Sequence, residues 1–87
     1  MPARGTRRVM DRGSAWKLFG APTDQEGSVN DPRTSEEHGV RWNEKWIYRG
    51  EDGVSVERIV LWNRYDLAGV FRAKADGGFE PEPLPRS

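Results

Sequence analysis

The large apolar side chains of this chain are concentrated in residues 40–72, where they alternate with polar residues over long stretches. Alternation with a period of two is typical of β-strands, whose successive side chains point to opposite faces. In residues 41–49, Trp42, Trp46 and Tyr48 fall on one side and mainly polar residues fall on the other. The pattern therefore predicts a strand with one packed face and one wet face.

Turn signals divide the rest of this apolar region into further strands. Gly50-Glu51-Asp52-Gly53 predicts a hairpin connection, and residues 63–66 and 76–78 predict two more turns. The strands expected between them cover residues 54–62 and 67–73, with a brief last strand at Phe79. Residues 59–62 are apolar on both faces, which predicts cover on both sides of the sheet. Gly69 marks an expected bulge or close backbone approach.

The segments before residue 40 carry weaker patterns. In residues 14–22, Trp16 and Leu18 alternate as in a strand, while Ser14 is also a suitable cap for a single helical turn. We favour a short edge strand there, because the rest of the core is β. The long connection 22–39 is expected to be mobile at residues 23–30. A short helical turn is expected near residues 32–38, after the capping residue Asp31 and Pro32.

These elements predict a mainly β fold: a small single domain built as an antiparallel meander of three to five strands. The sheet is expected to curl into a half-barrel or an SH3-like arrangement. The expected organisation is a basic flexible arm (residues 1–13), a small β domain (14–80) that contains the loop 22–39, and a proline-rich extended tail (81–87).

Composition narrows the possible function classes. The 14 basic residues balance the 14 acidic ones, which argues against adhesion of the whole domain to nucleic acid or to a membrane surface. The longest apolar run, Ile59 to Trp62, is far shorter than a membrane span. The chain has no cysteine, which excludes disulfides and thiolate metal sites. We therefore expect a cytoplasmic protein without a membrane association.

No group of residues has the spacing of a known catalytic or cofactor-binding motif. His38 is the single histidine, and we interpret it as a solvated residue that ends the short helix. No metal, no cofactor and no enzymatic activity are expected. Glu44 is expected to form an ion pair with Arg58 across the first hairpin, and Trp16, Trp46 and Trp62 are expected to form the core.

The content of tryptophan, tyrosine and arginine exceeds the need of so small a core, and these residues dominate binding hot spots. Trp42 and Tyr65 lie near predicted strand ends and are expected to be exposed. The candidate binding residues are Trp42, Tyr65, Arg64, Asn43, Lys45, Arg7 and Arg8.

Three hypotheses of function follow from this content. The leading one is a non-catalytic protein-interaction module or small accessory subunit, which docks on a protein partner or a second copy through an aromatic sheet face and its tails. The alternative is a nucleic-acid-binding module that uses the arginine-rich arm and exposed aromatic rings. A third, less favoured hypothesis is a ligand-binding or enzymatic pocket formed by Trp42, Glu44, Tyr48 and Asp66.

Overall fold

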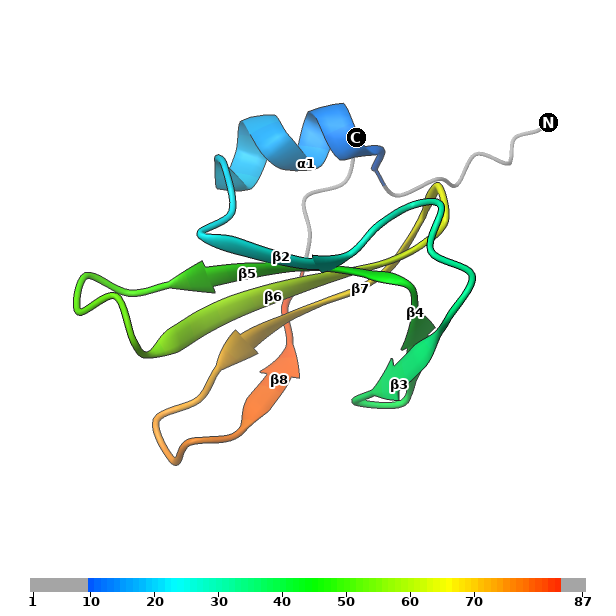
Figure 1. Cartoon of the computed structure of the whole chain (residues 1–87). Coiled ribbons are helices and arrows are strands. Elements are labelled where there is room, and N and C mark those ends of the chain that lie inside the picture. Colours follow the sequence, from blue (N-terminus) through cyan, green and yellow to red (C-terminus); the bar gives the residue numbers. More distant parts are fainter. Residues whose placement is uncertain (1–9, 84–87) are drawn as a thin grey trace, which may run out of the picture.

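The computed structural model describes residues 10–83 and confirms a mainly β fold with antiparallel strands (Figure 1). The elements in this part of the chain are α1 (Arg12–Phe19), β2 (Asp24–Gly27), β3 (Ser35–Glu37), β4 (Val40–Trp42), β5 (Glu44–Arg49), β6 (Val56–Asn63), β7 (Asp66–Ala73) and β8 (Phe79–Pro81). Five strands form one sheet in the order β2-β5-β6-β7-β8, and β3 and β4 form a separate two-stranded sheet. Because β2 and β8 stand at opposite edges, the sheet is open and is not a closed barrel.

The predicted meander is confirmed in β5 to β8, where each strand pairs with the next one along the chain. Asn63 of β6 is the register partner of Asp66 of β7, so the second hairpin has a two-residue loop. Arg64 in this loop has φ 60°. The irregularity expected at Gly69 is also confirmed: the register shifts between Leu61, which faces Gly69, and Trp62, which leaves one extra residue in β7.

The edge strand predicted for residues 14–22 is wrong, because the segment forms the helix α1. Asp11 is the N-cap, and its Oδ1 accepts a hydrogen bond of 2.8 Å from the Ser14 amide. Gly20 ends the helix with φ 83° and donates its N–H to the Trp16 carbonyl. A cap at each end stabilises two turns of helix, and the buried Ala15 packs them onto the sheet.

The helical turn predicted near residues 32–38 is wrong as well. Residues 35–37 form β3, which pairs with β4 through the two-residue loop His38-Gly39. Both loop residues have positive φ, 56° and 84°, as the tight hairpin turns that match strand twist require. Asp31 caps a turn and not a helix, because its Oδ1 accepts the Arg33 amide at 3.0 Å. The segment 23–30, predicted to be a mobile loop, contains β2.

The strand predicted over residues 41–49 is broken at Asn43, which separates β4 from β5. The break reverses the faces of the flanking residues. Trp42 therefore packs on the face of the sheet opposite to that of Trp46 and Tyr48.

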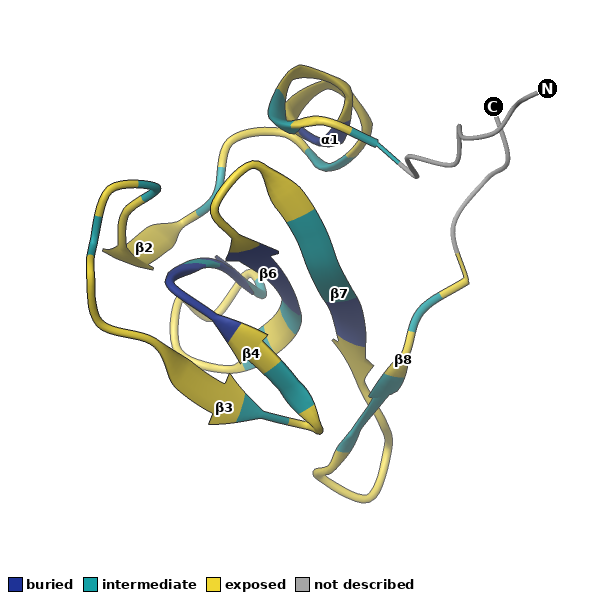
Figure 2. Ribbon diagram, turned by 90° about the vertical axis from the view of Figure 1, so that its right-hand side faces the viewer, coloured by how far each residue is buried: buried dark blue, intermediate teal, exposed yellow. Residues whose placement is uncertain are grey.

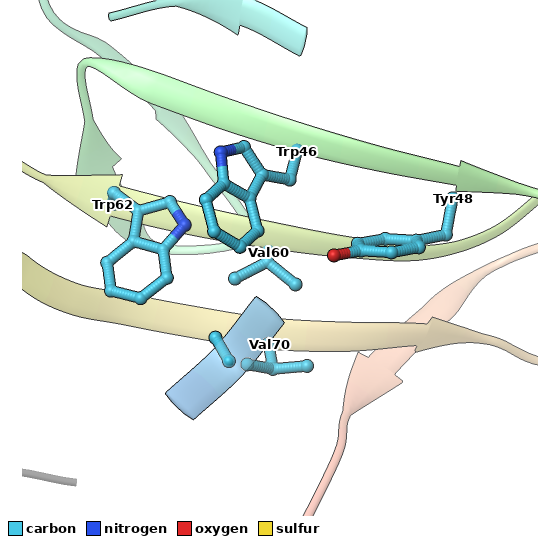
Figure 3. Close-up of a cluster of buried hydrophobic side chains, with 6 residues drawn as sticks. Trp46, Tyr48, Val60, Trp62 and Val70 are labelled. Carbon is cyan, nitrogen blue, oxygen red and sulfur yellow. The ribbon is translucent and has the colours of Figure 1, made fainter. Parts of the chain in front are cut away.

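The sheet is covered on both faces, as the apolar residues 59–62 predicted (Figure 2). The helix face lies under α1. Its buried side chains are Trp46, Tyr48, Val60, Trp62 and Val70, and Ala15 of α1 packs against them (Figure 3). The hairpin face is contacted by β4 and contains Trp42, Ile47, Ile59, Leu61 and Phe71. β6 supplies buried side chains to both faces, which makes it the central strand of the core.

Candidate functional site

A buried carboxylate joins the helix to the sheet. Glu44, at the start of β5, is 7% exposed, and its two oxygens accept hydrogen bonds from three side chains. Arg12 of α1 donates to Oε1 from both Nε, at 3.1 Å, and Nη2. Trp46 Nε1, at 2.9 Å, and Gln25 Nε2, at 3.2 Å, donate to Oε2. The ion pair expected between Glu44 and Arg58 is wrong, because Arg58 binds Glu82.

The Arg12 guanidinium also lies close to two aromatic rings. Its Cζ is 4.7 Å from the centroid of the Trp62 ring and 5.9 Å from that of the Tyr65 ring. Both distances are within the range of attraction between a cation and a π-system. Glu44 and the two rings therefore fix the position of Arg12 at the junction of α1 with the β6–β7 turn.

Trp16 follows Arg12 by four residues and so lies on the same flank of the helix. Its ring meets the Trp46 ring edge-on, with 5.7 Å between centroids and 89° between planes. Trp16 was expected in the core, but 48% of it is exposed, and Tyr65 is 74% exposed. We call Trp16, Arg12 and Tyr65 the aromatic strip. The strip combines two exposed rings with a guanidinium that Glu44 holds in place.

Of the predicted binding residues, Tyr65 is exposed as expected, but Trp42 is not. Trp42 is 9% exposed, and the Lys45 Nζ lies 5.4 Å from its ring centroid. Lys45 also forms an ion pair of 2.9 Å with Glu37. Lys45 and Trp42 therefore fasten the β3–β4 hairpin to the sheet. Arg7 and Arg8 lie outside the described residues.

Asn43 is a connector of three loops and not a surface contact. It is 2% exposed, and its Nδ2 donates to the carbonyls of Val29 and Asp31 at 3.1 and 3.2 Å. Its Oδ1 accepts the Arg64 amide at 2.9 Å, and Arg64 Nη1 donates to the Val29 carbonyl. Asn43 thus holds the β4–β5 break, the loop after β2 and the β6–β7 turn together.

A cleft of about 500 Å³ opens beside the outer strand β2, and its walls are Glu26, Gly27, Asp31, Arg33, Thr34, Ser35, Trp42 and Asn43. Arg33 binds Asp31 in this wall, and its hydrogen bonds lower the pKa of the Asp31 carboxyl below its ordinary value. The pocket predicted from Trp42, Glu44, Tyr48 and Asp66 does not form, because Trp42 packs on the hairpin face whereas Tyr48 packs on the helix face.

His38 is exposed, as expected, but it does not end a helix. It lies in the β3–β4 turn, with its ring centroid 4.7 Å from that of Phe71 and 5.5 Å from that of Phe79. Its Nε2 is 3.6 Å from a Glu37 oxygen. Within residues 10–83, no three histidine, aspartate or glutamate side chains gather closely enough to hold a metal ion.

Sequence reasoning missed Arg12, Gln25 and the exposure of Trp16. The available signal was the pair Asp11 and Gly20, which bracket eight residues with a cap at each end. Read as a helix, this segment places Arg12 and Trp16 on one flank, four residues apart. Gln25 had no signal, because its role depends on the pairing of β2 with β5.

Comparison of the chain with protein-family models, with curated proteins and with solved structures finds no significant match in any of the three. In the part of the chain that the structure describes, no helix has the length and apolar character needed to cross a membrane.

Proposed function

We propose that this chain is a non-catalytic protein-interaction module, whose binding surface is the aromatic strip. The observation that carries the proposal is the exposure of Trp16, on the same helix as Arg12, and of Tyr65, whose ring lies 5.9 Å from the Arg12 guanidinium. Tryptophan, tyrosine and arginine are the residues most enriched in binding hot spots, where large rings are covered by a partner. The sheet face that was expected to dock is covered by α1 and β4. The proposed docking surface is instead at the junction of α1 with the β6–β7 turn.

The strip is held in place before any partner binds. Glu44 fixes the Arg12 guanidinium, and Trp46 supports Trp16 edge-on. An immobilised side chain loses less conformational entropy on association, so more of its contact energy appears as affinity. This preorganisation supports a protein-binding role, because a ring without a packing partner in the free protein would lose more conformational entropy on docking.

The charge balance favours a protein over a nucleic acid as the partner. The 14 basic and 14 acidic residues of the whole chain cancel, so the chain has no excess of positive charge to attract phosphates. We propose a cytoplasmic location on the absence of cysteine, which is compatible with a reducing compartment.

The test begins with crosslinking and affinity capture of the partner from the source organism, followed by binding measurements with the purified partner. Trp16→Ser and Tyr65→Ser are each expected to weaken binding by about tenfold or more, the effect of losing a hot-spot ring. The controls are Leu18→Ser and Val54→Ser, which remove apolar side chains that are 47% and 72% exposed but lie outside the strip.

Equal losses in the controls and in the strip variants would contradict the proposal. A bound oligonucleotide whose affinity falls steeply with salt would support the nucleic-acid alternative instead. Sedimentation of the wild-type chain identifies a second copy as the partner if the strip variants dissociate an oligomer.

A further inference from the structure

The sheet has two edges, and they differ in how far they are protected. β8 contains Pro81, which cannot donate a backbone hydrogen bond, and its Glu80 pairs with Arg72 of the neighbouring β7. β2 contains no proline, and within residues 10–83 it pairs with β5 alone. The other side of β2 is thus open to a further strand.

The backbone groups on the open side of β2 can be assigned from the pairing. The Ser28 amide donates to the Asn43 carbonyl at 3.1 Å, which makes these two residues a hydrogen-bonded pair just beyond the end of β2. In an antiparallel ladder, hydrogen-bonded pairs alternate with non-bonded ones. Asp24 and Glu26 therefore direct their backbone groups towards β5, and Gln25 and Gly27 direct theirs outwards.

The two faces beside this edge carry different chemistry. On the helix face, Gln25 is the register partner of Trp46, on which the half-exposed Trp16 ring stands. On the hairpin face, Glu26 lies in the wall of the cleft and has no ion-pair partner among the described residues. Its register partner Lys45 is bound to Glu37 instead. An added strand would meet an aromatic ring on one face and an uncompensated carboxylate on the other.

We propose that β2 is a docking edge for an extended basic segment of another protein, which pairs with the backbone of Gln25 and Gly27. An apolar side chain of that segment packs on Trp16, and a lysine or arginine beside it faces Glu26 near the cleft. This is strand addition to a sheet edge, in which the backbone gives affinity and the alternating side chains give specificity. The inference rests on the proposed function as an interaction module and names its partner class.

A second copy of the chain is a poor occupant of this edge. Pairing of β2 with β2 brings Asp24 and Glu26 of both copies to the same short ladder. Like charges opposite one another destabilise a sheet, and this repulsion selects against self-pairing. The acidic edge therefore favours a basic partner strand.

The test uses a capped nonapeptide of alternating lysine and valine as the probe, with alternating glutamate and valine as its control. In a titration followed by amide NMR, the lysine peptide is expected to shift the Gln25 and Gly27 signals and to slow their hydrogen exchange. The glutamate peptide is expected to bind about tenfold more weakly, since it meets Glu26 with like charge. Absence of shifts at Gln25 and Gly27 would overturn the inference. This outcome is independent of whether the Trp16→Ser and Tyr65→Ser variants weaken binding of the purified partner.

Two pairs of variants make the readout specific. Gln25→Pro and Gln25→Ala both remove the amide side chain, but only proline removes the outward N–H. The proline variant is expected to lose about tenfold more affinity than the alanine variant. Glu26→Lys is expected to reverse the preference towards the glutamate peptide, whereas Glu51→Lys in the exposed β5–β6 turn leaves it unchanged. Equal binding by both Gln25 variants, or a wild-type dimer that Gln25→Pro dissociates, would overturn the inference.

Discussion

The two faces of the sheet are held by different kinds of interaction. On the helix face, two aromatic side chains have polar atoms with fixed partners: Trp46 Nε1 donates to Glu44, and Tyr48 Oη donates to the Gly20 carbonyl at 2.9 Å. The third, Trp62, has a buried Nε1 without a hydrogen-bond partner among the described residues. The hairpin face is packed by aliphatic side chains, Phe71 and Trp42, and the buried Trp42 Nε1 has no hydrogen-bond partner among the described residues. The helix face is therefore directional, whereas the hairpin face depends on close packing.

This difference explains why the candidate surface is on the helix face. A helix of two turns is too short to be stable alone, so its position depends on its contacts with the sheet. The buried Ala15 packs α1 against the sheet, and the ion pair between Arg12 and Glu44 sets the orientation of the helix. The same contacts that orient the helix hold Trp16 and Tyr65 in the strip.

The largest effect is expected on the hairpin face. Leu61→Ala removes a side chain with no solvent exposure and leaves a cavity, which is expected to cost about 3 kcal/mol of unfolding free energy. Urea denaturation measures the loss. Val54→Ala, at a position that is 72% exposed, is the control and should change stability by less than about 0.5 kcal/mol. Similar losses in both variants would show that the hairpin face is not closely packed.

The directional character of the helix face is tested at Glu44. Glu44→Gln keeps the shape of the side chain but removes the charge that Arg12 neutralises, and its amide N–H₂ meets the donors of Trp46 or Gln25. Breaking this partly buried network is expected to cost about 2 to 3 kcal/mol. Thermal unfolding measures the cost, with Glu51→Gln in an exposed turn as the control.

A second measurement locates the effect of Glu44→Gln. The variant should increase hydrogen exchange in α1 more than in β6 and β7, since the carboxylate joins the helix to the sheet. Uniform exchange across the domain would mean that Glu44 contributes to global stability without orienting α1.

Tyr48 makes the stability of the helix face dependent on pH. Burial raises the pKa of the Tyr48 hydroxyl to about 12, and the nearby Arg58 charge opposes part of this rise. The folded state thus retains the proton more tightly than the unfolded chain, whose tyrosine ionises near pH 10. The stabilisation is complete below pH 10 and is lost as the pH rises from about 10 to 12.

The loss over this window is expected to be on the order of 2 kcal/mol relative to Tyr48→Phe, which cannot ionise. Denaturation curves of both proteins at pH 9 and above measure the difference. Parallel pH profiles for the two proteins would contradict the burial of the hydroxyl against Gly20.

The comparison of the faces also shows which parts of the fold could be predicted. The meander from β5 to β8 was predictable, because turn signals separate its strands and each strand pairs with its neighbour. The cover on both faces followed from residues 59–62. Their apolar side chains on both sides of one strand require two packed layers.

The elements before residue 40 could not be placed by local patterns. The turn His38-Gly39 needs positive φ at both residues, and histidine is a weaker signal for it than asparagine or aspartate. The break at Asn43 is invisible in the alternation. It accompanies hydrogen bonds that the Asn43 side chain donates to Val29 and Asp31 and accepts from the Arg64 amide, all distant in sequence.

The candidate site was predictable only in part, for the same reason. Tyr65 stands at the tip of a recognisable hairpin, so its exposure followed from the sequence. Trp42 changes face at the Asn43 break and is buried. Trp16 is exposed because α1 packs Ala15, and not Trp16, against the sheet. This orientation of the helix depends on the pairing of Arg12 with Glu44.

The smallest predicted effect is a difference between two ion pairs on the helix face, one under α1 and one beyond it. Arg58 and Arg72 are register partners in β6 and β7, and each binds a glutamate at the C-terminal edge of the sheet. Arg58 binds Glu82 through two hydrogen bonds of 2.7 and 2.8 Å and stacks on Phe19 of α1. Arg72 binds Glu80 through one hydrogen bond of 3.0 Å.

Double-mutant cycles with Arg→Met and Glu→Gln substitutions measure both pairs in the same protein. The coupling energy between Arg58 and Glu82 is expected to be about 1 kcal/mol, since the pair is bidentate and shielded by the helix. The coupling between Arg72 and Glu80, whose side chains are about half exposed, should be below about 0.5 kcal/mol. Equal coupling energies would mean that α1 does not shield the ion pair between Arg58 and Glu82. The directional interactions that stabilise the helix face would then be limited to the Glu44 network.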